Sequence, residues 1–289
     1  LIVRVVSELK MPQPTLCVRV SSDMDRDWKK LVYSVLPELS GQIQLFNDDV
    51  INKAMVRSKF PRDIALNHTF SACNRTDYPG GYSLEYYHNM VAWLLEALEK
   101  AAREKVGSVD DIVDIFGKIA EREILKQRAE YFPDTGPRFH LESLLMNGCP
   151  QKACDAENNG SVVLSKCHYF SELATVTDSF SAIREAVFEL KLLTLEELND
   201  CVKNDFDGKE ELAVFLRHRC PKYGNSDDRA DRFAKRISEM VFSSLDKANK
   251  LSGADTANYG GFYSLFKHHG KKWTEHATPD GRRAFEPLS

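Results

Sequence analysis

The chain has 289 residues, of which 43% are hydrophobic and 28% are charged, and its formal net charge is −4. This is the composition of a folded protein with one large core or about two domains. A small net charge without a basic stripe argues against a nucleic-acid partner. Apolar runs such as residues 91–95 are far too short to cross a bilayer, so we expect no membrane partner.

The first third of the chain predicts short strands that alternate with helices. Residues 15–20, TLCVRV, alternate apolar and polar side chains with the period of a strand. Residues 27–36 place their apolar side chains on one face of a helix. The stretch 41–50, GQIQLFNDDV, predicts a turn, an extended run and a cap at Asn47 and Asp48 for a helix near 50–56. Residues 61–81 begin as a helix and end in a Pro-Gly-Gly break.

Helical signals dominate the rest of the chain. Capping residues predict four helix starts, at Ser83, at Ser108 with Asp111, at Thr194 with Glu197, and at Ser226. The first of these helices should run to residue 105 and the last to about residue 250. Residues 177–190 show an amphipathic helical pattern. Helices between short strands predict an α/β fold in which helices join parallel strands.

The cysteine pattern indicates the cellular compartment of the protein and whether it binds a metal. Seven cysteines are an odd number, and none forms a CxxC pair, so we expect reduced thiols and a cytoplasmic protein. Neither the adjacent pair His268 and His269 nor the loop with Cys149 and Cys154 has the spacing of a metal site, and we predict no metal. The start, LIVRVVSELK, has no initiator Met and no signal-peptide pattern, so we expect both ends to be truncated.

One cysteine lies in a suggestive place. Cys73 lies in FSACNRTDYPGG, between a predicted strand and a turn. Side chains alternate along an extended segment, so Cys73 and Arg75 should point the same way. A lone cysteine is most often a small buried apolar residue. A reactive Cys73 and a structural Cys73 are therefore both open on this pattern alone.

Several longer motifs add a family resemblance. The end of the chain, ATPDGRRAFEPLS, closely resembles the A-T-P-D-G-R…E-P-L-S signature of glycyl radical enzymes of the pyruvate formate-lyase type. CPKYGNSDD resembles that family's P-K-Y-G-N-D-D loop, and TDSFSAIREAVFELKLLTLEEL resembles two of its helices. QPTLCVRV and LFNDDVI resemble two earlier strand regions of the family, in the same order.

The resemblance implies a fold and a chemistry. Residues 1–289 would be one partial catalytic domain, part of a ten-stranded α/β barrel surrounded by helices, without the C-terminal segment whose glycine stores the radical. PRDIALNHTFSAC resembles the family's A-R-D-Y-A-x-x-G-C, so Cys73 would be the thiyl-forming cysteine. No cofactor would be bound. An AdoMet-dependent iron–sulfur activating enzyme would install the glycyl radical, in an anaerobic, cytoplasmic homodimer that is inactive as this fragment.

The match departs from the family around the cysteine. Many lyases of the family write C-V-E, with Glu as the base, whereas this chain reads Cys73, Asn74, Arg75. A guanidinium is not a base at neutral pH, so Asp77 or His68 would take that role. Arg75 would grip a substrate carboxylate or another oxyanion, or it would form an ion pair with Asp77 or Glu85.

The remaining expectations concern the substrate and the reaction. CDAENNGS resembles a region of the family written D-x-x-x-G-G-A-x-Y, which places Asp155 at a substrate-binding position. The neighbour of Cys73 is Ala72, where pyruvate formate-lyase has a second cysteine. We therefore expect a radical lyase or dehydratase acting on a small polar molecule. The alternatives are acyl transfer or radical carbon–carbon chemistry on a carboxylate, and a non-catalytic relative that keeps the scaffold.

Overall fold

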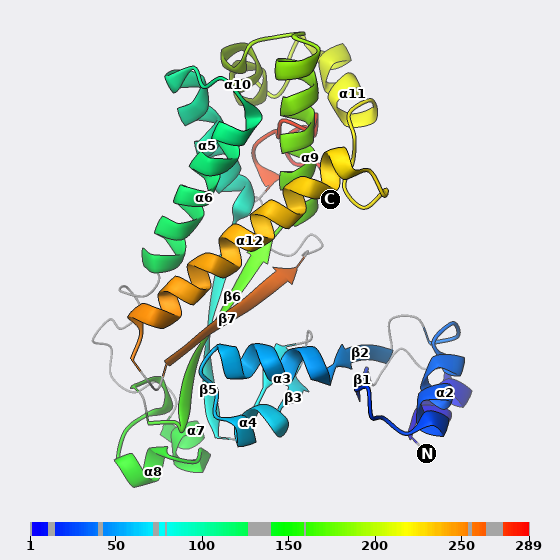
Figure 1. The fold of residues 1–289 in the computed structure, drawn as a ribbon, viewed down its shortest axis with the longest axis vertical. Coiled ribbons are helices and arrows are strands. Elements are labelled where there is room, and N and C mark those ends of the chain that lie inside the picture. The colour runs from blue at the N-terminus through cyan, green and yellow to red at the C-terminus, as the bar shows by residue number, and fades with distance from the viewer. Residues whose placement is uncertain are drawn as a thin grey trace. The chain divides into compact units, whose positions relative to one another are not determined.

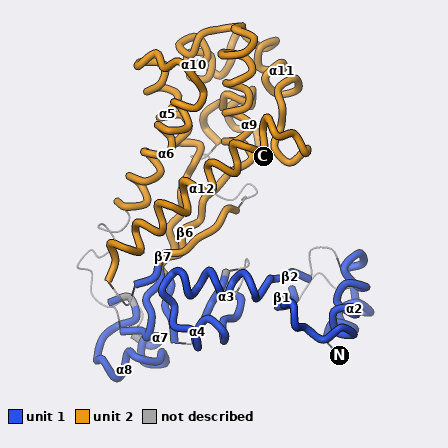
Figure 2. The backbone as a smooth tube through the Cα atoms, viewed as in Figure 1, with its two compact units in different colours: residues 1–83, 137–165, 254–257 blue, residues 84–136, 166–253, 258–289 orange. Residues whose placement is uncertain are grey.

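The computed structural model describes residues 2–10, 15–39, 43–71, 75–78, 80–126, 140–158, 160–253, 256–263 and 274–288 (Figure 1). The chain divides into two compact units, coloured separately in Figure 2. Unit 1 contains residues 1–83, 137–165 and 254–257, and unit 2 contains residues 84–136, 166–253 and 258–289.

Unit 1 begins with a parallel strand pair. Strand β1 (Leu16–Val20) pairs with β2 (Ile43–Asn47), and helix α2 (Arg26–Val35) lies between them in the chain. The register runs from Leu16 opposite Ile43 to Val20 opposite Asn47. A small apolar core of Val3, Val6, Val18, Val32, Leu39 and Ile43 lies around this pair and helix α1 (Ile2–Leu9). The predicted strand, helix and parallel pairing are confirmed here.

The next part of unit 1 follows the carboxyl end of β2. Helix α3 (Asp48–Arg57) starts where predicted, because the Asn47 side chain accepts a hydrogen bond from the Val50 backbone N–H at 3.2 Å. Helix α4 (Arg62–Leu66) leads into an antiparallel hairpin of β3 (Thr69–Ser71) and β4 (Arg75–Asp77). Helices α7 (His140–Leu145) and α8 (Cys149–Lys152) and a 3₁₀ turn (Ala156–Asn158) complete the unit.

Unit 2 combines most of a three-stranded sheet with a helical core. The strand order is β5 (Gly81–His88), β6 (Val163–Ser171) and β7 (Thr256–Tyr263), and the later residues of each strand belong to unit 2. The helices are α5 (Met90–Glu104), α6 (Val109–Lys126), α9 (Leu173–Ile183), α10 (Leu195–Lys203), α11 (Glu210–His218) and α12 (Asp228–Leu251). Helix α12 packs against α6 and α9 in Figure 1, and the large apolar core lies among these helices.

Three predicted elements of unit 2 need correction. The helix expected from Ser83 exists but begins later than predicted: residues 81–88 form β5, and Asn89 caps α5 by accepting from the Ala92 N–H at 3.1 Å. The 177–190 segment is helical as predicted, but residues 175–183 of α9 are all buried, so the predicted amphipathic pattern fails in its first half, and α9 continues as a π-helix over Arg184–Glu189. Helix α12 is capped by Asp227 rather than by Ser226.

The remaining helix starts and the fold class agree with the sequence. Ser108 accepts from the Asp111 N–H at 3.2 Å, and Thr194 forms the expected capping box with Glu197. The α/β class is confirmed. None of the helices in the described part of the chain combines the length and the apolar character that a bilayer crossing requires.

Candidate functional site

The β3–β4 hairpin of unit 1 carries most of the residues that the sequence singled out. Its register places Thr69 opposite Asp77, Phe70 opposite Thr76 and Ser71 opposite Arg75. Cys73 belongs to the connection 72–74 and lies outside the described residues. Arg75 begins β4, and His68 directly precedes β3. Three predicted site residues therefore belong to one hairpin and its entry.

The two faces of the hairpin have different surroundings. Paired residues of an antiparallel ladder share a face, so Thr69 and Asp77 lie on one side and Phe70 and Thr76 on the other. The Phe70 ring stacks on Phe46 of β2, with centroids 3.6 Å apart and planes 19° apart. Asp77 therefore lies on the face turned away from this stack, and the residue as a whole is half-buried.

His68 is a buried support of the hairpin. Its side chain is 0% exposed, and Nδ1 lies 2.7 Å from the Ala65 carbonyl oxygen, to which it donates. Nε2 lies 3.4 Å from Asp48 Oδ1, and the ring meets Phe70 edge-on with centroids 5.2 Å apart. Both ring nitrogens thus face oxygen atoms of unit 1. This geometry favours a structural histidine over one that faces a substrate.

Sequence reasoning missed the arginine that holds this region together. Arg19 of β1 donates to both carboxylate oxygens of Asp48, from Nε at 2.6 Å and from Nη2 at 2.5 Å. Its Nη1 donates to the His68 carbonyl at 2.9 Å and its Nη2 to the Leu66 carbonyl at 3.0 Å. The sequence did contain a hint of this ion pair. Arg19 lies near the end of the apolar strand β1, and the acidic residue Asp48 directly follows β2, the parallel neighbour of β1.

The loop with Asp155 is a tight turn of unit 1. The Asp155 carbonyl accepts from the backbone N–H groups of Asn158 and Gly160, both at 2.9 Å. A Cβ at Gly160 would lie 2.0 Å from the Cys154 carbonyl oxygen, so only glycine fits there. Burial, followed by the charge of Asp155, raises the pKa of the Cys149 thiol. The loop holds a carboxylate beside a thiol that keeps its proton.

Three sequence motifs meet in unit 2. The Asp178 carboxylate of α9 accepts from the Tyr223 backbone N–H at 2.7 Å, in the PKYGN loop. The Ser181 hydroxyl donates to the Pro221 carbonyl at 2.8 Å, and Lys222 donates to the Asp280 carbonyl at 3.4 Å. Burial raises the pKa of Asp178 to about 6. Motifs more than 40 residues apart therefore form one local structure.

Arg282 organises the last of these motifs. Arg282 is 4% exposed, and its guanidinium donates to the backbone carbonyls of His276, Arg283 and Glu286. Gly281 has a φ of +88°, and a Cβ there would lie 2.2 Å from the Ala213 carbonyl oxygen. Burial lowers the pKa of Arg282. The arginine is bonded to its own loop, which gives it a structural role.

A buried pair of histidines links the strands of unit 2. His88 Nε2 lies 2.9 Å from His168 Nδ1, and the rings are parallel within 4°. His168 Nε2 lies 3.4 Å from the amide oxygen of Asn258. Burial lowers the pKa of His88 to about 4, and burial followed by the charge of His88 lowers the pKa of His168 to about 3. Both imidazoles are therefore neutral at physiological pH.

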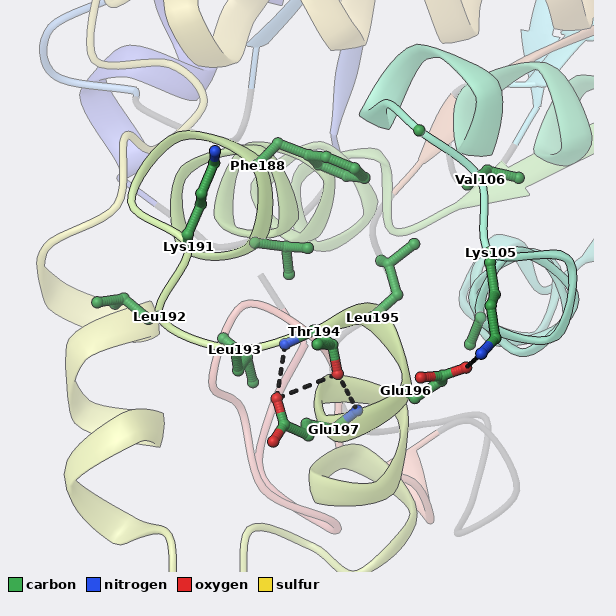
Figure 3. A pocket seen from close by; sticks show the side chains of 13 residues that line it. Lys105, Val106, Phe188, Lys191, Leu192, Leu193, Thr194, Leu195, Glu196 and Glu197 are labelled. Atoms are coloured by element: carbon green, nitrogen blue, oxygen red, sulfur yellow. Dashed lines mark hydrogen bonds and ion pairs between the residues drawn. The ribbon is translucent and has the colours of Figure 1, made fainter.

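A hollow of about 650 Å³ in unit 2 is open to solvent and has polar groups that serve the fold (Figure 3). Thr194 and Glu197 bond each other in the capping box of α10, and Lys105 pairs with Glu196 at 3.3 Å. Hydrogen bonds from Thr194 lower the pKa of Glu197. These groups are arranged to stabilise a helix start, and we place no chemistry there.

The comparisons with known proteins agree with the motifs. A family model described as pyruvate formate lyase-like matches residues 1–260. Isethionate sulfite-lyase of Desulfovibrio desulfuricans is 27% identical over 322 residues, which cover 100% of this chain and 38% of that protein. The glycerol-bound B12-independent glycerol dehydratase from Clostridium butyricum is similar with a TM-score of 0.78 at 21% identity.

A further solved relative is a glycyl radical enzyme from Archaeoglobus fulgidus, with a TM-score of 0.75 at 21% identity. Each of these two structural matches covers 99% of this chain and 39% of the solved one. The chain thus spans about two fifths of the length of the relatives it matches. The family model covers well over half of the 289 residues. The chain belongs to the pyruvate formate lyase-like family.

Proposed function

We propose that this chain is the part of a glycyl radical lyase or dehydratase that carries the thiyl-forming cysteine, Cys73. The observation that supports the proposal is the antiparallel pairing of Ser71 with Arg75, because these two residues flank the connection that contains Cys73 in the sequence. A hairpin turn can reach into a cavity while its strands remain anchored. The anchors are the Phe46–Phe70 stack and the hydrogen bonds of Arg19.

The chemistry needs a thiol at this position. The S–H bond of a cysteine and the Cα–H bond of a glycine have comparable strength, since the glycyl radical is delocalised over its two amides. One hydrogen atom can therefore move reversibly between them, which supplies a thiyl radical at Cys73. The thiyl sulfur takes a hydrogen atom from a substrate carbon and becomes S–H again. After the leaving group departs, the thiol returns the hydrogen atom to the product radical.

The proposal gives roles to the other predicted residues. Asp77 is the preferred base, because it lies on the hairpin face away from the Phe46–Phe70 stack. His68 is the second candidate, which would have to act from its buried position beside Asp48. We assign Arg75 to the oxyanion of a substrate and Asp155 to a polar group of it, by hydrogen bonds to their charged ends.

The relatives support a small polar substrate. Isethionate and glycerol, which appear in the names of two relatives, are both small hydroxylated molecules. We infer elimination next to a hydroxyl group, because loss of a β leaving group from a ketyl radical suits both dehydration and sulfite release. The family resemblance further supports a cytoplasmic homodimer with a ten-stranded barrel, a radical glycine after residue 289 and an AdoMet-dependent iron–sulfur activating enzyme.

Turnover by the complete, anaerobically activated protein tests this function. A panel of glycerol, 1,2-propanediol, isethionate and trans-4-hydroxy-L-proline covers neutral, anionic and zwitterionic substrates. We expect one of them to be consumed by the wild type and none by Cys73→Ala. Cys201→Ala, which changes a half-buried cysteine on α10, is the matched control and should retain activity. Turnover by Cys73→Ala at the wild-type rate would refute the assignment.

A further inference from the structure

The Arg19 side chain hydrogen-bonds to several segments near the β3–β4 hairpin. It lies near the carboxyl end of β1, opposite Phe46 of β2, and Asp48 follows two residues later at the start of α3. Its guanidinium forms four hydrogen bonds, two to the Asp48 carboxylate and two to the carbonyls of Leu66 and His68. These partners are 29 to 49 residues away in the chain.

Only a guanidinium can make this set of bonds. Its planar fork matches the two oxygens of a carboxylate, and its remaining N–H groups point outward for other acceptors. Leu66 is the last residue of α4, so its carbonyl is one of the unsatisfied groups at a helix end. A lysine ammonium could reach one or two of these oxygens but could not join the carboxylate to both carbonyls.

The two carbonyls belong to the segment that enters the hairpin. His68 immediately precedes Thr69, the first residue of β3, and Phe70 is already packed on Phe46. The Arg19 side chain is 32% exposed and that of Asp48 17%, so solvent screens this ion pair only partly. Arg19 therefore fixes the backbone from which the strand toward residue 73 departs.

We propose that Arg19, oriented by Asp48, is a positioning residue that fixes the start of β3 and thereby controls the rate of hydrogen-atom transfer at Cys73; this inference rests on the proposed function. A strand advances about 3.3 Å per residue, so a shift at His68 is carried along β3. Transfer of an atom between two heavy atoms is sensitive to displacements of about 1 Å, which cost on the order of 100-fold in rate. Arg19 itself touches no reacting atom.

The test measures hydrogen transfer without a substrate. In the activated protein, the hydrogen on the radical-bearing glycine carbon splits the electron paramagnetic resonance signal into a doublet. If Cys73 exchanges that hydrogen with its thiol, transfer to D₂O buffer turns the doublet into a singlet. We expect Arg19→Lys to form the same amount of radical but to slow the doublet-to-singlet conversion at least tenfold. Asp48→Asn, which loosens the fork but leaves the arginine in place, should slow the conversion by a smaller factor.

A matched control distinguishes an effect on the position of β3 from the general effect of losing a bidentate ion pair. Arg122 of α6 also makes a bidentate pair, with Glu96 of α5, at 2.8 Å for both bonds, and both side chains are exposed. Arg122→Lys should exchange at the wild-type rate. Wild-type exchange rates in both Arg19→Lys and Asp48→Asn would overturn the inference, and Asp48→Asn decides it if Arg19→Lys does not fold. A wild type that keeps its doublet in D₂O would instead contradict the proposed function.

Discussion

The Phe70 ring of the cysteine hairpin lies on the Phe46 ring of the neighbouring strand β2, with centroids 3.6 Å apart. Phe46 also stands opposite Arg19 in the parallel pair of strands. Phe46 of β2 thus contacts the Phe70 ring of the hairpin. Arg19, which pairs with Phe46 in the ladder, donates hydrogen bonds to the backbone just before β3. The hairpin is held by an aromatic stack and by hydrogen bonds, which come from paired residues of β2 and β1.

Phe46→Leu should weaken that anchor. The substitution keeps an apolar side chain but removes the ring–ring interaction, which contributes about 1 kcal/mol beyond burial. We expect the free energy of unfolding, measured with urea, to fall by about that amount. Tyr33→Leu changes an aromatic residue of α2 that is 49% exposed, and it should stay within about 0.5 kcal/mol of the wild type. Equal effects of the two changes would show that the stack contributes nothing specific.

Arg75→Lys tests the proposed grip on an oxyanion. Loss of one of two parallel hydrogen bonds to a substrate oxyanion should cost about 1.4 kcal/mol, which is tenfold in affinity. For an anionic substrate we expect KM to rise about tenfold with a smaller change in kcat. A neutral diol offers no oxyanion, and its KM should change little. An unchanged KM for the anionic substrate would assign Arg75 to an ion pair within the protein.

The histidine pair predicts how stability depends on pH. His88 and His168 have pKa values of about 4 and about 3 in the fold, against about 6.5 in an unfolded chain. Between pH 6.5 and pH 5 the unfolded chain binds more protons, so the free energy of unfolding falls as the pH falls. The loss is at most about 1.4 kcal/mol per pH unit for each histidine.

His88→Asn removes one of these titrations and keeps a hydrogen-bonding group. Urea unfolding at pH 6.5, 6.0, 5.5 and 5.0 should show a slope that is smaller than the wild-type slope by up to about 1.4 kcal/mol per pH unit. A wild-type slope in the variant would mean that His88 does not take up a proton on unfolding.

Asp178 makes the free energy of unfolding depend on pH in the opposite direction to the two histidines. Its pKa of about 6 lies above the value of 3.8 for an unperturbed aspartate, so the folded protein binds the extra proton. The stabilisation from this group is complete below about pH 3.8 and is lost as the pH rises through 6. Asp178→Asn keeps an acceptor for the Tyr223 N–H and cannot ionise. Its melting temperature relative to wild type should therefore rise between pH 5 and pH 7. A constant difference across that range would contradict the raised pKa.

Local chemistry explains which elements could be predicted from the sequence. The Asn47 cap of α3 and the Thr194–Glu197 box of α10 are formed by residues three positions apart, so their signals are visible in any short window. Strand β1 alternates apolar and polar residues because its two faces differ. These elements were predicted with their starts correct to within a residue or two.

The strands of unit 2 could not be predicted in the same way. In β6 nearly every residue is buried, so the period-two signal of a strand is absent. In β5 the buried residues Leu84, Tyr86 and His88 do alternate, but Ser83 and the apolar run after Asn89 favoured one long helix. Residues 81–88 form a strand because they pair with β6, about 80 residues later in the chain.

The candidate site shows the same division. The family motif indicated Cys73 and Arg75, which lie two residues apart in the sequence. Arg19 and Asp48 are 29 residues apart, and their contact depends on the register of β1 with β2. His68 was predicted as an alternative to Asp77 for the role of the base, whereas its burial follows from packing on Phe70 and Asp48.

Exchange between the glycyl radical and solvent tests the role of Cys73 most directly. The measurement compares the complete wild-type protein and Cys73→Ala, both activated without oxygen and transferred to D₂O. Our account predicts that both show a doublet at first, that the wild-type signal becomes a singlet, and that the alanine variant keeps its doublet. Conversion to a singlet at the same rate in both proteins would mean that another group relays the hydrogen, and it would contradict the assignment of Cys73.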